Sequence, residues 1–218
     1  MRISPTPGKT LDRRAFNLVE VTVLVATLSI LALWGFPALV QAKDKQRRIR
    51  CVSHLKQIGL SFRLFATDHQ ERFPMKVTTN QGGSFEHIML GDVYWHYRVM
   101  SNELGTSKIL QCPDDKPEKA TVFTTLTNNS QVSYFVGLDA EENSPELLLC
   151  GDHHISGLIP SSNRVFLLET TRTIGWSGKL HRGLGQVALG DGSVQQTTSD
   201  LLRSCVSRAP ARQRLAMP

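Results

Sequence analysis

Side chains of the types that bind metals occur at a few places along this sequence. Zinc and calcium are held by imidazole, thiolate and carboxylate groups. Such groups stand at Asp114, Asp115, Cys150, Asp152, His153, His154 and His181. Zinc sites usually show local pairs such as Cys-x2-Cys or His-x3-His, and neither pair occurs here. Adjacent histidines in a loop are expected to point apart, so we expect a solvated loop at Asp152–His154 and no bound metal.

The chain shows no recognised catalytic constellation. Gly-x-Ser-x-Gly is absent, and no glycine-rich loop has the spacing that cradles phosphate. The nearest candidate, Gly183, Gly185 and Gly190, is too loose for a dinucleotide fingerprint. Ser193 beside Asp191 is interpreted as a turn serine. We therefore expect no enzyme activity and no cofactor.

A β-hairpin is predicted near the C-terminal end, around an Asp-Gly turn. Gly185–Leu189 alternates in polarity and places Val187 and Leu189 on one face, and a second short strand starts at Val194. Asp191 and Gly192 are expected to supply the positive φ angles of the turn. His181 is then expected to be a cross-strand or capping partner, with a ligand role as the alternative.

The remaining elements predict an α+β fold with one globular domain. A helical stripe with apolar residues every three or four positions runs through Ile49, Val52, Leu55, Ile58, Phe62 and Phe65. This helix is expected to end by Arg72-Phe73-Pro74, before a loop at Thr78–Gly83. Strands are expected at Val132–Val136, Val165–Leu168 and Gln186–Leu189, and helices at Asn102–Leu110 and at Ser199–Val206, the latter capped by Ser199 or Asp200.

A long apolar run near the N-terminus predicts a membrane segment. Phe16–Val40 is 25 residues long, about 37 Å as a helix, which is long enough to cross a bilayer and too long for the apolar core of a secretory signal peptide. Glu20 is the only ionisable residue in this run. Because an unpaired carboxylate in hydrocarbon costs several kcal/mol, Glu20 is expected to be functional.

The residues around Glu20 carry a family resemblance. Arg13-Arg14-Ala15-Phe16-Asn17-Leu18-Val19-Glu20 closely resembles the type IV prepilin cleavage and methylation motif, with Ala15 in place of the usual Gly. The resemblance implies that prepilin peptidase cuts between Ala15 and Phe16 and that the new N-terminal Phe16 is N-methylated. It also implies that Glu20 neutralises the N-terminal amine of a neighbouring subunit during assembly.

Two further phrases resemble pseudopilin-like proteins of planctomycete and verrucomicrobial type. His181, nine residues and Asp191-Gly192 match their C-terminal His-x9-Asp-Gly region, and the phrase from Cys51 to Leu60 resembles one that follows their anchor, with His54 replacing Asn. The resemblance implies a pilin-like fold: a long N-terminal helix, first transmembrane and then amphipathic, packed on a small antiparallel sheet.

The four cysteines are consistent with disulfides if the part of the chain after the apolar run lies outside the cytoplasm. Cys51, Cys112, Cys150 and Cys205 allow three complete pairings, and the residues alone do not choose among them. The resemblance favours Cys51 with Cys112, because their two phrases recur together in the resembling proteins. Buried free thiols are an equal alternative.

The expected organisation follows from these segments. We expect a leader peptide at 1–15, a transmembrane helix at 16–40, an amphipathic stalk helix at 41–72 and a periplasmic α+β head at 73–218, with the signature at 181–192. The charges that flank the apolar run slightly favour the reverse orientation. Prepilin processing requires a cytoplasmic leader, so the motif decides for a single-pass inner-membrane protein.

The expected function is structural. We expect a pseudopilin-like subunit of a type II secretion or type IV pilus-like assembly, whose partners are prepilin peptidase, sister subunits and the secretion machinery or its cargo. One alternative is a membrane-tethered binding module of the envelope that uses the leader only for export. The other is a tethered metal-dependent hydrolase using His153, His154, His181 and Asp191.

The net charge of the chain does not indicate nucleic-acid binding. The formal charge is +6 and the pI about 9.4, but the basic residues lie mostly in the leader, in Lys43–Arg50 and in the tail from Arg203 to Arg214. None of these blocks contains interleaved aromatic residues or a nucleic-acid motif. We expect no nucleic acid among the partners.

Overall fold

The computed structural model describes residues 17–115, 122–169, 173–178, 181, 183–209 and 212–218, without the side chains of 33–39. The leader and the proposed cleavage site at Ala15 and Phe16 lie outside the described residues. The chain divides into two units, residues 1–43 and residues 44–218, and each is considered by itself.

The first unit contains the N-terminal part of helix α1 (Leu18–Asp68). Its start is capped from within, because the Glu20 carboxylate accepts a hydrogen bond from the backbone N–H of Asn17, with Oε2 and N 3.1 Å apart. A search of the described residues finds no helix that combines the length and apolar character of a membrane span.

The second unit is built on one large antiparallel sheet. Its strands are β1 (Tyr134–Gly137), β2 (Leu148–Asp152), β4 (Ile159–Ser162), β5 (Val165–Glu169), β7 (Gly185–Leu189), β8 (Val194–Thr197) and β9 (Arg212–Ala216). They lie in the order β4-β5-β9-β1-β2-β7-β8, with every neighbouring pair antiparallel. A small second sheet pairs β3 (Ile155–Ser156) with β6 (Gly175–Trp176). The predicted α+β class is confirmed.

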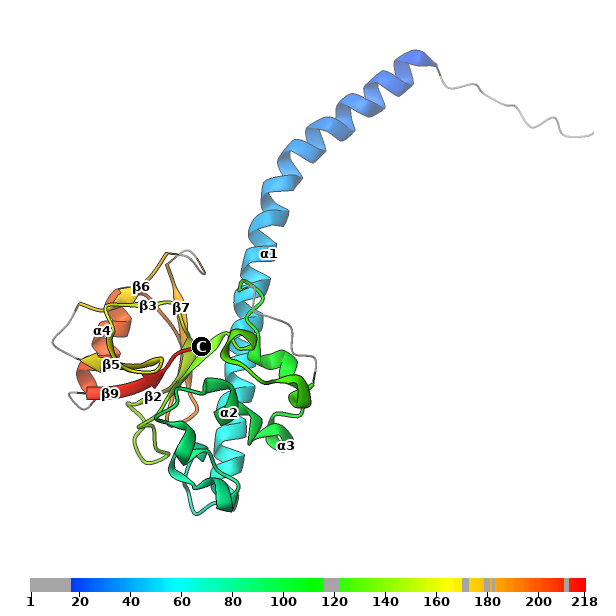
Figure 1. The fold of residues 1–218 in the computed structure, drawn as a ribbon. Helices are drawn as coiled ribbons and strands as arrows, with labels where there is room; N and C mark the ends of the chain where they lie inside the picture. Colours follow the sequence, from blue (N-terminus) through cyan, green and yellow to red (C-terminus); the bar gives the residue numbers. More distant parts are fainter. Residues whose placement is uncertain (1–16, 116–121, 170–172, 179–180, 182, 210–211) are drawn as a thin grey trace, which may run out of the picture. The chain divides into compact units, whose positions relative to one another are not determined.

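Short helices complete this unit. They are α2 (Val93–Arg98), α3 (Ser101–Leu104), α4 (Ser199–Arg208) and the 3-10 helices η1 (Pro74–Lys76), η2 (Thr79–Gln81), η3 (Phe85–His87), η4 (Ser107–Leu110), η5 (Phe123–Thr125) and η6 (Asn129–Gln131). In Figure 1, α2 and α3 lie beside the C-terminal part of α1, and α4 lies beyond the strands.

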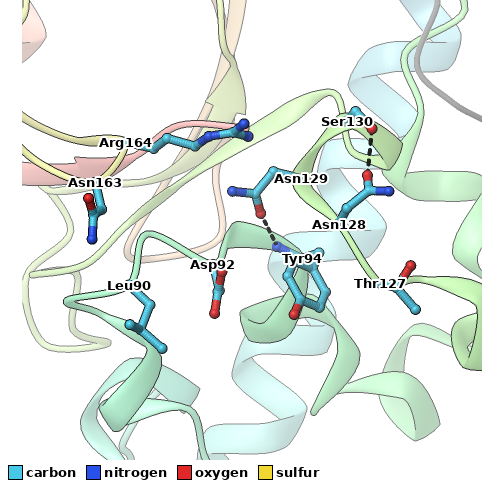
Figure 2. A pocket seen from close by; sticks show the side chains of 9 residues that line it. All are labelled: Leu90, Asp92, Tyr94, Thr127, Asn128, Asn129, Ser130, Asn163 and Arg164. Atoms are coloured by element: carbon cyan, nitrogen blue, oxygen red, sulfur yellow. Dashed lines mark hydrogen bonds between the residues drawn. The ribbon is translucent and has the colours of Figure 1, made fainter.

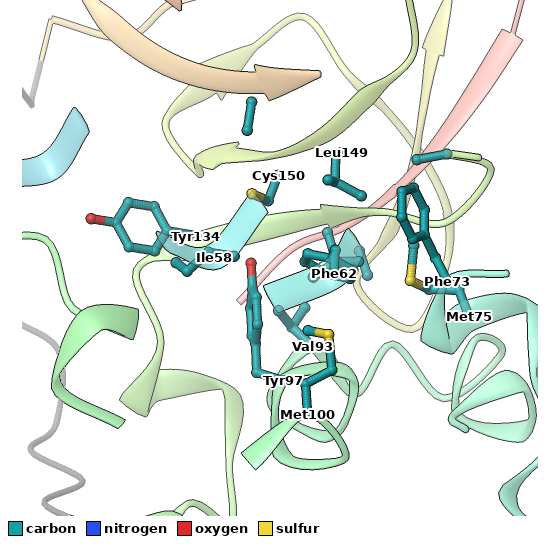
Figure 3. Close-up of a cluster of buried hydrophobic side chains, with 14 of the residues drawn as sticks. Ile58, Phe62, Phe73, Met75, Val93, Tyr97, Met100, Tyr134, Leu149 and Cys150 are labelled. Atoms are coloured by element: carbon teal, nitrogen blue, oxygen red, sulfur yellow. The ribbon is translucent and has the colours of Figure 1, made fainter. Parts of the chain in front are cut away.

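The sheet separates two cores because successive strand side chains point to opposite faces. Tyr134 and Val136 of β1 belong to the core that contains the buried residues of α1, whereas Phe135 belongs to the core that contains Leu202 and Val206 of α4. Figure 3 shows the first core, in which the ring of Phe62 meets those of Phe73 and Tyr97 edge to face, at interplanar angles of 70° and 67°. The second unit therefore has a layer of helix, a layer of sheet and a layer of helix.

The predicted apolar stripe of α1 is confirmed in its C-terminal part. Leu55, Ile58, Phe62 and Phe65 are at most 2% exposed, whereas Ile49 is 60% exposed and does not join the core. The helix ends at Asp68, earlier than the expected position of 72. Gln70 and Glu71 explain the early end, because their φ angles of 59° and 58° are incompatible with a continuing right-handed helix.

Two predicted helices differ from the structure at their ends. Asn102–Leu110 is split into α3 and η4 at Gly105, whose φ of 67° terminates the first segment. Helix α4 is capped by Thr198, whose hydroxyl accepts a hydrogen bond from the N–H of Leu201, and the predicted caps Ser199 and Asp200 are wrong. The loop predicted at Thr78–Gly83 contains the 3-10 helix η2.

The predicted hairpin is confirmed as β7 and β8, with one correction at the turn. Within the turn, positive φ falls on Gly192 (81°) and not on Asp191. Asp191 instead accepts a hydrogen bond on Oδ1 from the N–H of Ser193, at 2.8 Å. The turn lies against α1: the carbonyl oxygen of Gly192 would be 3.5 Å from a Cβ atom at Gly59, and the guanidinium of Arg63 reaches the carbonyl of Asp191.

Candidate functional site

Four buried side chains from distant parts of the chain converge at one place in the second unit. They are Cys51 of α1, Cys112 of the loop after η4, Asp152 at the end of β2 and His181 before β7. One potential ligand atom from each side chain lies within 4.8 Å of the others. Because the four positions span 130 residues of sequence, tertiary folding alone brings them together.

Packing on the first core fixes the two cysteines. Cys51 lies one helical turn before Leu55 on the buried face of α1 and is itself fully buried. The loop that carries Cys112 is held to the same helix, because Nδ1 of His54 lies 3.1 Å from the carbonyl oxygen of Gln111. The hydroxyl of Tyr134 on β1 donates to Sγ of Cys51.

The structure joins Cys51 and Cys112 in a disulfide whose Cα atoms are 5.6 Å apart. This separation lies within the range that a disulfide requires, and the pair is the one that the family resemblance favours. Cys150 and Cys205 are free, buried thiols. Burial raises the pKa of the Cys150 thiol, so Cys150 is a structural side chain and no nucleophile.

His181 lies inside this cluster, where its side chain contacts two carboxylates and a cysteine sulfur from other parts of the chain. The side chain is fully buried, with Nδ1 2.8 Å from Oδ2 of Asp114. Nε2 lies 3.4 Å from Sγ of Cys112 and 3.6 Å from Oδ2 of Asp152. Burial lowers the pKa of His181, and the carboxylate of Asp114 opposes that shift. We assign the neutral tautomer with the proton on Nδ1 facing Asp114, which leaves the Nε2 lone pair facing the cluster.

Asp152 is also buried, so the solvated loop expected at this position is wrong. The residue is 1% exposed because it is the last residue of β2 and pairs with Tyr134 of β1. Its Oδ2 accepts a hydrogen bond from the backbone N–H of Gln186, at 2.8 Å, and its Oδ1 has no hydrogen-bond partner among the described residues. The pKa of Asp152 is raised to about 7, chiefly by burial; the hydrogen bond from Gln186 lowers it, and the nearby carboxylates of Asp115 and Asp114 raise it.

The other residues singled out from the sequence lie outside the cluster. His153 and His154 do not point apart as expected, because their ring centroids are 3.9 Å from each other. His153 lies 2.9 Å from the carbonyl oxygen of Ser133 through Nδ1 and 3.7 Å from Oδ2 of Asp115. Asp191 and Gly192 stay in the hairpin turn. Glu20 belongs to the first unit.

The arrangement supports two chemistries that exclude each other. As a disulfide, Cys51 and Cys112 covalently link α1 to the loop after η4. As thiolates, the same two sulfur atoms with His181 and Asp152 make a donor set of two sulfurs, one nitrogen and one oxygen, a set that zinc accepts. His181 and Asp152 are recognisable in the sequence as ligand-type residues, but Cys51 and Cys112 are not indicated as ligands, because no locally spaced pair marks them.

A second feature of this unit is a polar surface pocket of about 480 Å³, shown in Figure 2. It is lined by Leu90, Asp92, Tyr94, Thr127, Asn128, Asn129, Ser130, Asn163 and Arg164. Asn129 is held by two hydrogen bonds, accepting from the N–H of Tyr94 and donating to the carbonyl oxygen of Gly91. The lining contains no histidine and no cysteine, so it offers hydrogen bonds and one charge of each sign.

Comparisons with known proteins identify no relative. No family model matches the chain, no curated protein matches it, and no solved structure matches it.

Proposed function

We propose that this chain is a pseudopilin-like subunit, processed by prepilin peptidase between Ala15 and Phe16 and anchored in the inner membrane by the segment 16–40. The proposal depends on one observation: a basic leader runs directly into an apolar segment whose only ionisable residue is Glu20, five positions after Ala15. The head would lie in the periplasm and contact sister subunits and the secretion machinery or its cargo. The pilin-like description of the fold is part of this proposal.

The length of helix α1 and the side chains that it buries and exposes are consistent with such a subunit. Helix α1 is 51 residues long, far beyond the average helix of a globular protein. Its C-terminal part packs on an antiparallel sheet through Leu55, Ile58, Phe62 and Phe65. Its N-terminal part exposes a series of large apolar side chains, including Leu18, Val25, Leu28 and Leu31. Exposed apolar surface of this kind needs lipid or sister helices around it.

Glu20 supplies the chemistry of assembly in this proposal. Its carboxylate is exposed and receives one hydrogen bond from its own helix start, so it retains acceptor sites for a partner. A desolvated ammonium and a desolvated carboxylate are each costly alone and favourable as a satisfied pair. The amine freed at Phe16 of a neighbouring subunit would complete that pair.

Mass spectrometry of the mature N-terminus tests the processing step. The expected product begins with N-methylated Phe16. An intact Met1, or a cut after the apolar run, would overturn the proposal.

Cross-linking of detergent-solubilised or native membranes tests the role of Glu20. Replacing Glu20 by Gln removes the charge at nearly constant shape, and the loss of a buried ion pair of about 3 kcal/mol lowers the association constant about 100-fold. Glu71→Gln is the matched control, because Glu71 is exposed beyond the end of α1. Equal yields of cross-linked oligomer from the two variants would contradict the assembly role.

The polar pocket favours a second candidate function, a tethered binding module of the envelope. Its fixed Asn129, together with Asp92 and Arg164 in the same lining, suits a neutral, hydroxyl-rich ligand such as a polysaccharide segment. Binding of soluble oligosaccharides that survives Glu20→Gln and is lost in Asn129→Leu would support this candidate over assembly.

A further inference from the structure

We propose that Cys51, Cys112, Asp152 and His181 form a closed four-ligand site for Zn²⁺ when the two cysteines are reduced. The proposal concerns the second unit alone and does not depend on membrane assembly. It gives the histidine of the His-x9-Asp-Gly region a ligand role.

The distances between the ligand atoms fit a tetrahedral zinc site. With Zn–S bonds of about 2.3 Å and Zn–N and Zn–O bonds of about 2.0 to 2.1 Å, tetrahedral angles give about 3.6 Å from sulfur to nitrogen and about 3.4 Å from nitrogen to oxygen. The corresponding distances are 3.4 Å from Cys112 Sγ to His181 Nε2 and 3.6 Å from His181 Nε2 to Asp152 Oδ2. Both distances from His181 Nε2 therefore agree with the tetrahedral values to about 0.2 Å, and the remaining ligand atoms all lie within 4.8 Å of one another.

Binding of both sulfurs to one zinc ion requires a movement of one of them. Two sulfur atoms on one zinc ion lie about 3.8 Å apart, compared with about 2.0 Å in a disulfide. Rotation about the Cα–Cβ bond of a cysteine moves its sulfur by this amount without displacing the backbone. The separation of 5.6 Å between the Cα atoms of Cys51 and Cys112 can therefore serve both states.

The surroundings of the ligands match the outer shell of a metal site. A metal-binding histidine nearly always donates its second ring N–H to a carboxylate, a carbonyl or a water, which fixes its tautomer. Oδ2 of Asp114 lies 2.8 Å from Nδ1 of His181, and although the two atoms are not aligned as a hydrogen bond in this structure, a small rotation of the ring would let Asp114 receive that hydrogen. Ligand carboxylates are in turn hydrogen-bonded, and Asp152 receives the N–H of Gln186.

An independent observation also points to a cation. Oδ1 of Asp152 is buried and has no hydrogen-bond partner among the described residues, although most buried polar atoms in proteins have one. A buried carboxylate close to two other acidic residues is costly unless it is paired or holds a metal. A divalent ion bound by the Asp152 carboxylate offsets its buried negative charge, and a contact of that ion with Oδ1 as well as Oδ2 would also give Oδ1 a partner.

Binding of Zn²⁺ to the reduced site releases protons. Zn²⁺ binds two thiolates, a carboxylate and a neutral imidazole, and each thiol releases one proton on binding. No electrons move in this step. Opening an existing disulfide takes two electrons and two protons. A trialkylphosphine supplies the electrons and becomes the phosphine oxide, while water supplies its oxygen and the two protons.

Metal titration of the full-length chain in detergent, reduced with a trialkylphosphine, tests the proposal. Zn²⁺ is expected to bind at one equivalent per chain, and Co²⁺ is expected to give sulfur-to-cobalt charge transfer and the intense d–d absorption of a tetrahedral site. Asp152→Asn and His181→Gln each remove one ligand, so the affinity is expected to fall at least about 100-fold. Asp114→Asn removes a positioning residue and is expected to cost about 10- to 100-fold. Cys205→Ala is the matched control, because it removes a buried thiol outside the cluster.

The outcomes separate a metal site from a disulfide alone. Reduced wild-type protein that binds no Zn²⁺ overturns the proposal, and so does unchanged affinity in both Asp152→Asn and His181→Gln. If these variants fail to fold, alkylation of reduced wild-type protein decides the question. Zn²⁺ is expected to protect Cys51 and Cys112 from iodoacetamide, and equal labelling of both with and without Zn²⁺ overturns the proposal.

Discussion

Loss of the Cys51–Cys112 disulfide is expected to lower the free energy of unfolding by about 4 kcal/mol. The two cysteines are 61 positions apart in sequence. In the chain-entropy description, closing a loop of this size removes about 14 cal/mol/K from the unfolded state, which is about 4 kcal/mol at 25 °C. The double variant Cys51→Ala/Cys112→Ala therefore loses a large fraction of the roughly 5 to 15 kcal/mol that stabilises a typical domain.

Urea unfolding in detergent, followed by tryptophan fluorescence, measures this loss. With an m-value of about 2 kcal/mol/M, a loss of about 4 kcal/mol lowers the midpoint by about 2 M urea. A chelator is present in both samples, so that no metal replaces the disulfide. Because Cys150 and Cys205 remain, denatured wild-type protein has two reactive thiols without reductant and four after reduction.

Cys205→Ala gives the cost of removing one buried thiol without removing a covalent link. If the double variant loses no more than twice the stability that Cys205→Ala loses, the disulfide contributes nothing and the reasoning is refuted.

Two further predictions concern the interior of the second unit. Burial lowers the pKa of His96 to about 3, so between pH 6.5 and pH 4.5 only the unfolded chain gains this proton. The free energy of unfolding is therefore expected to fall by about 2 kcal/mol over that range. His96→Asn should remove this part of the pH dependence in urea titrations, and an unchanged slope would contradict the prediction. A Cβ atom at Gly185 would overlap the ring of Trp176, so Gly185→Ala is expected to lower the free energy of unfolding by about 1 to 3 kcal/mol, measured by thermal unfolding. Gly178→Ala is the control, because a Cβ atom there meets nothing within 4 Å and the substitution should be neutral. Equal losses of stability in the two variants would refute the prediction.

Local patterns in the sequence were sufficient for the elements that depend on local physics. The β7–β8 hairpin follows from alternating polarity and a glycine-containing turn, and the buried face of α1 follows from the spacing of Leu55, Ile58 and Phe62. Both signals lie within a few residues of the element they describe. The α+β class could therefore be predicted.

Strand β9 could not be predicted, because its charged and polar residues are stabilised by partners that are distant in the sequence. Arg212-Gln213-Arg214 resembles a solvated basic tail in the sequence. In the structure Arg212 pairs with Glu169, Arg214 pairs with Asp139, and the buried amide of Gln213 bonds to both backbone groups of Leu148. These partners lie tens of residues away, beyond the reach of any local pattern.

The four-residue cluster was missed for the same physical reason. Its members come from a helix, a loop, the end of a strand and a turn. Asp152 ends β2 and His181 precedes β7, so these two residues come together only when β2 pairs with β7. The sequence showed ligand-type residues but no short spacing between them. His181 carried a signal through the His-x9-Asp-Gly pattern, Asp152 through its place beside His153 and His154, and the two cysteines through the phrases that the family resemblance pairs.

The position of β9 between β5 and β1 has a consequence for the order of folding events during synthesis. This strand follows every other strand of the sheet along the chain, yet it occupies an interior place. Until residue 216 has left the ribosome, β4–β5 and β1–β2–β7–β8 are two unjoined fragments with unpaired edges. Such edges can pair with strands of other proteins, so the nascent chain would depend most on chaperones in that interval.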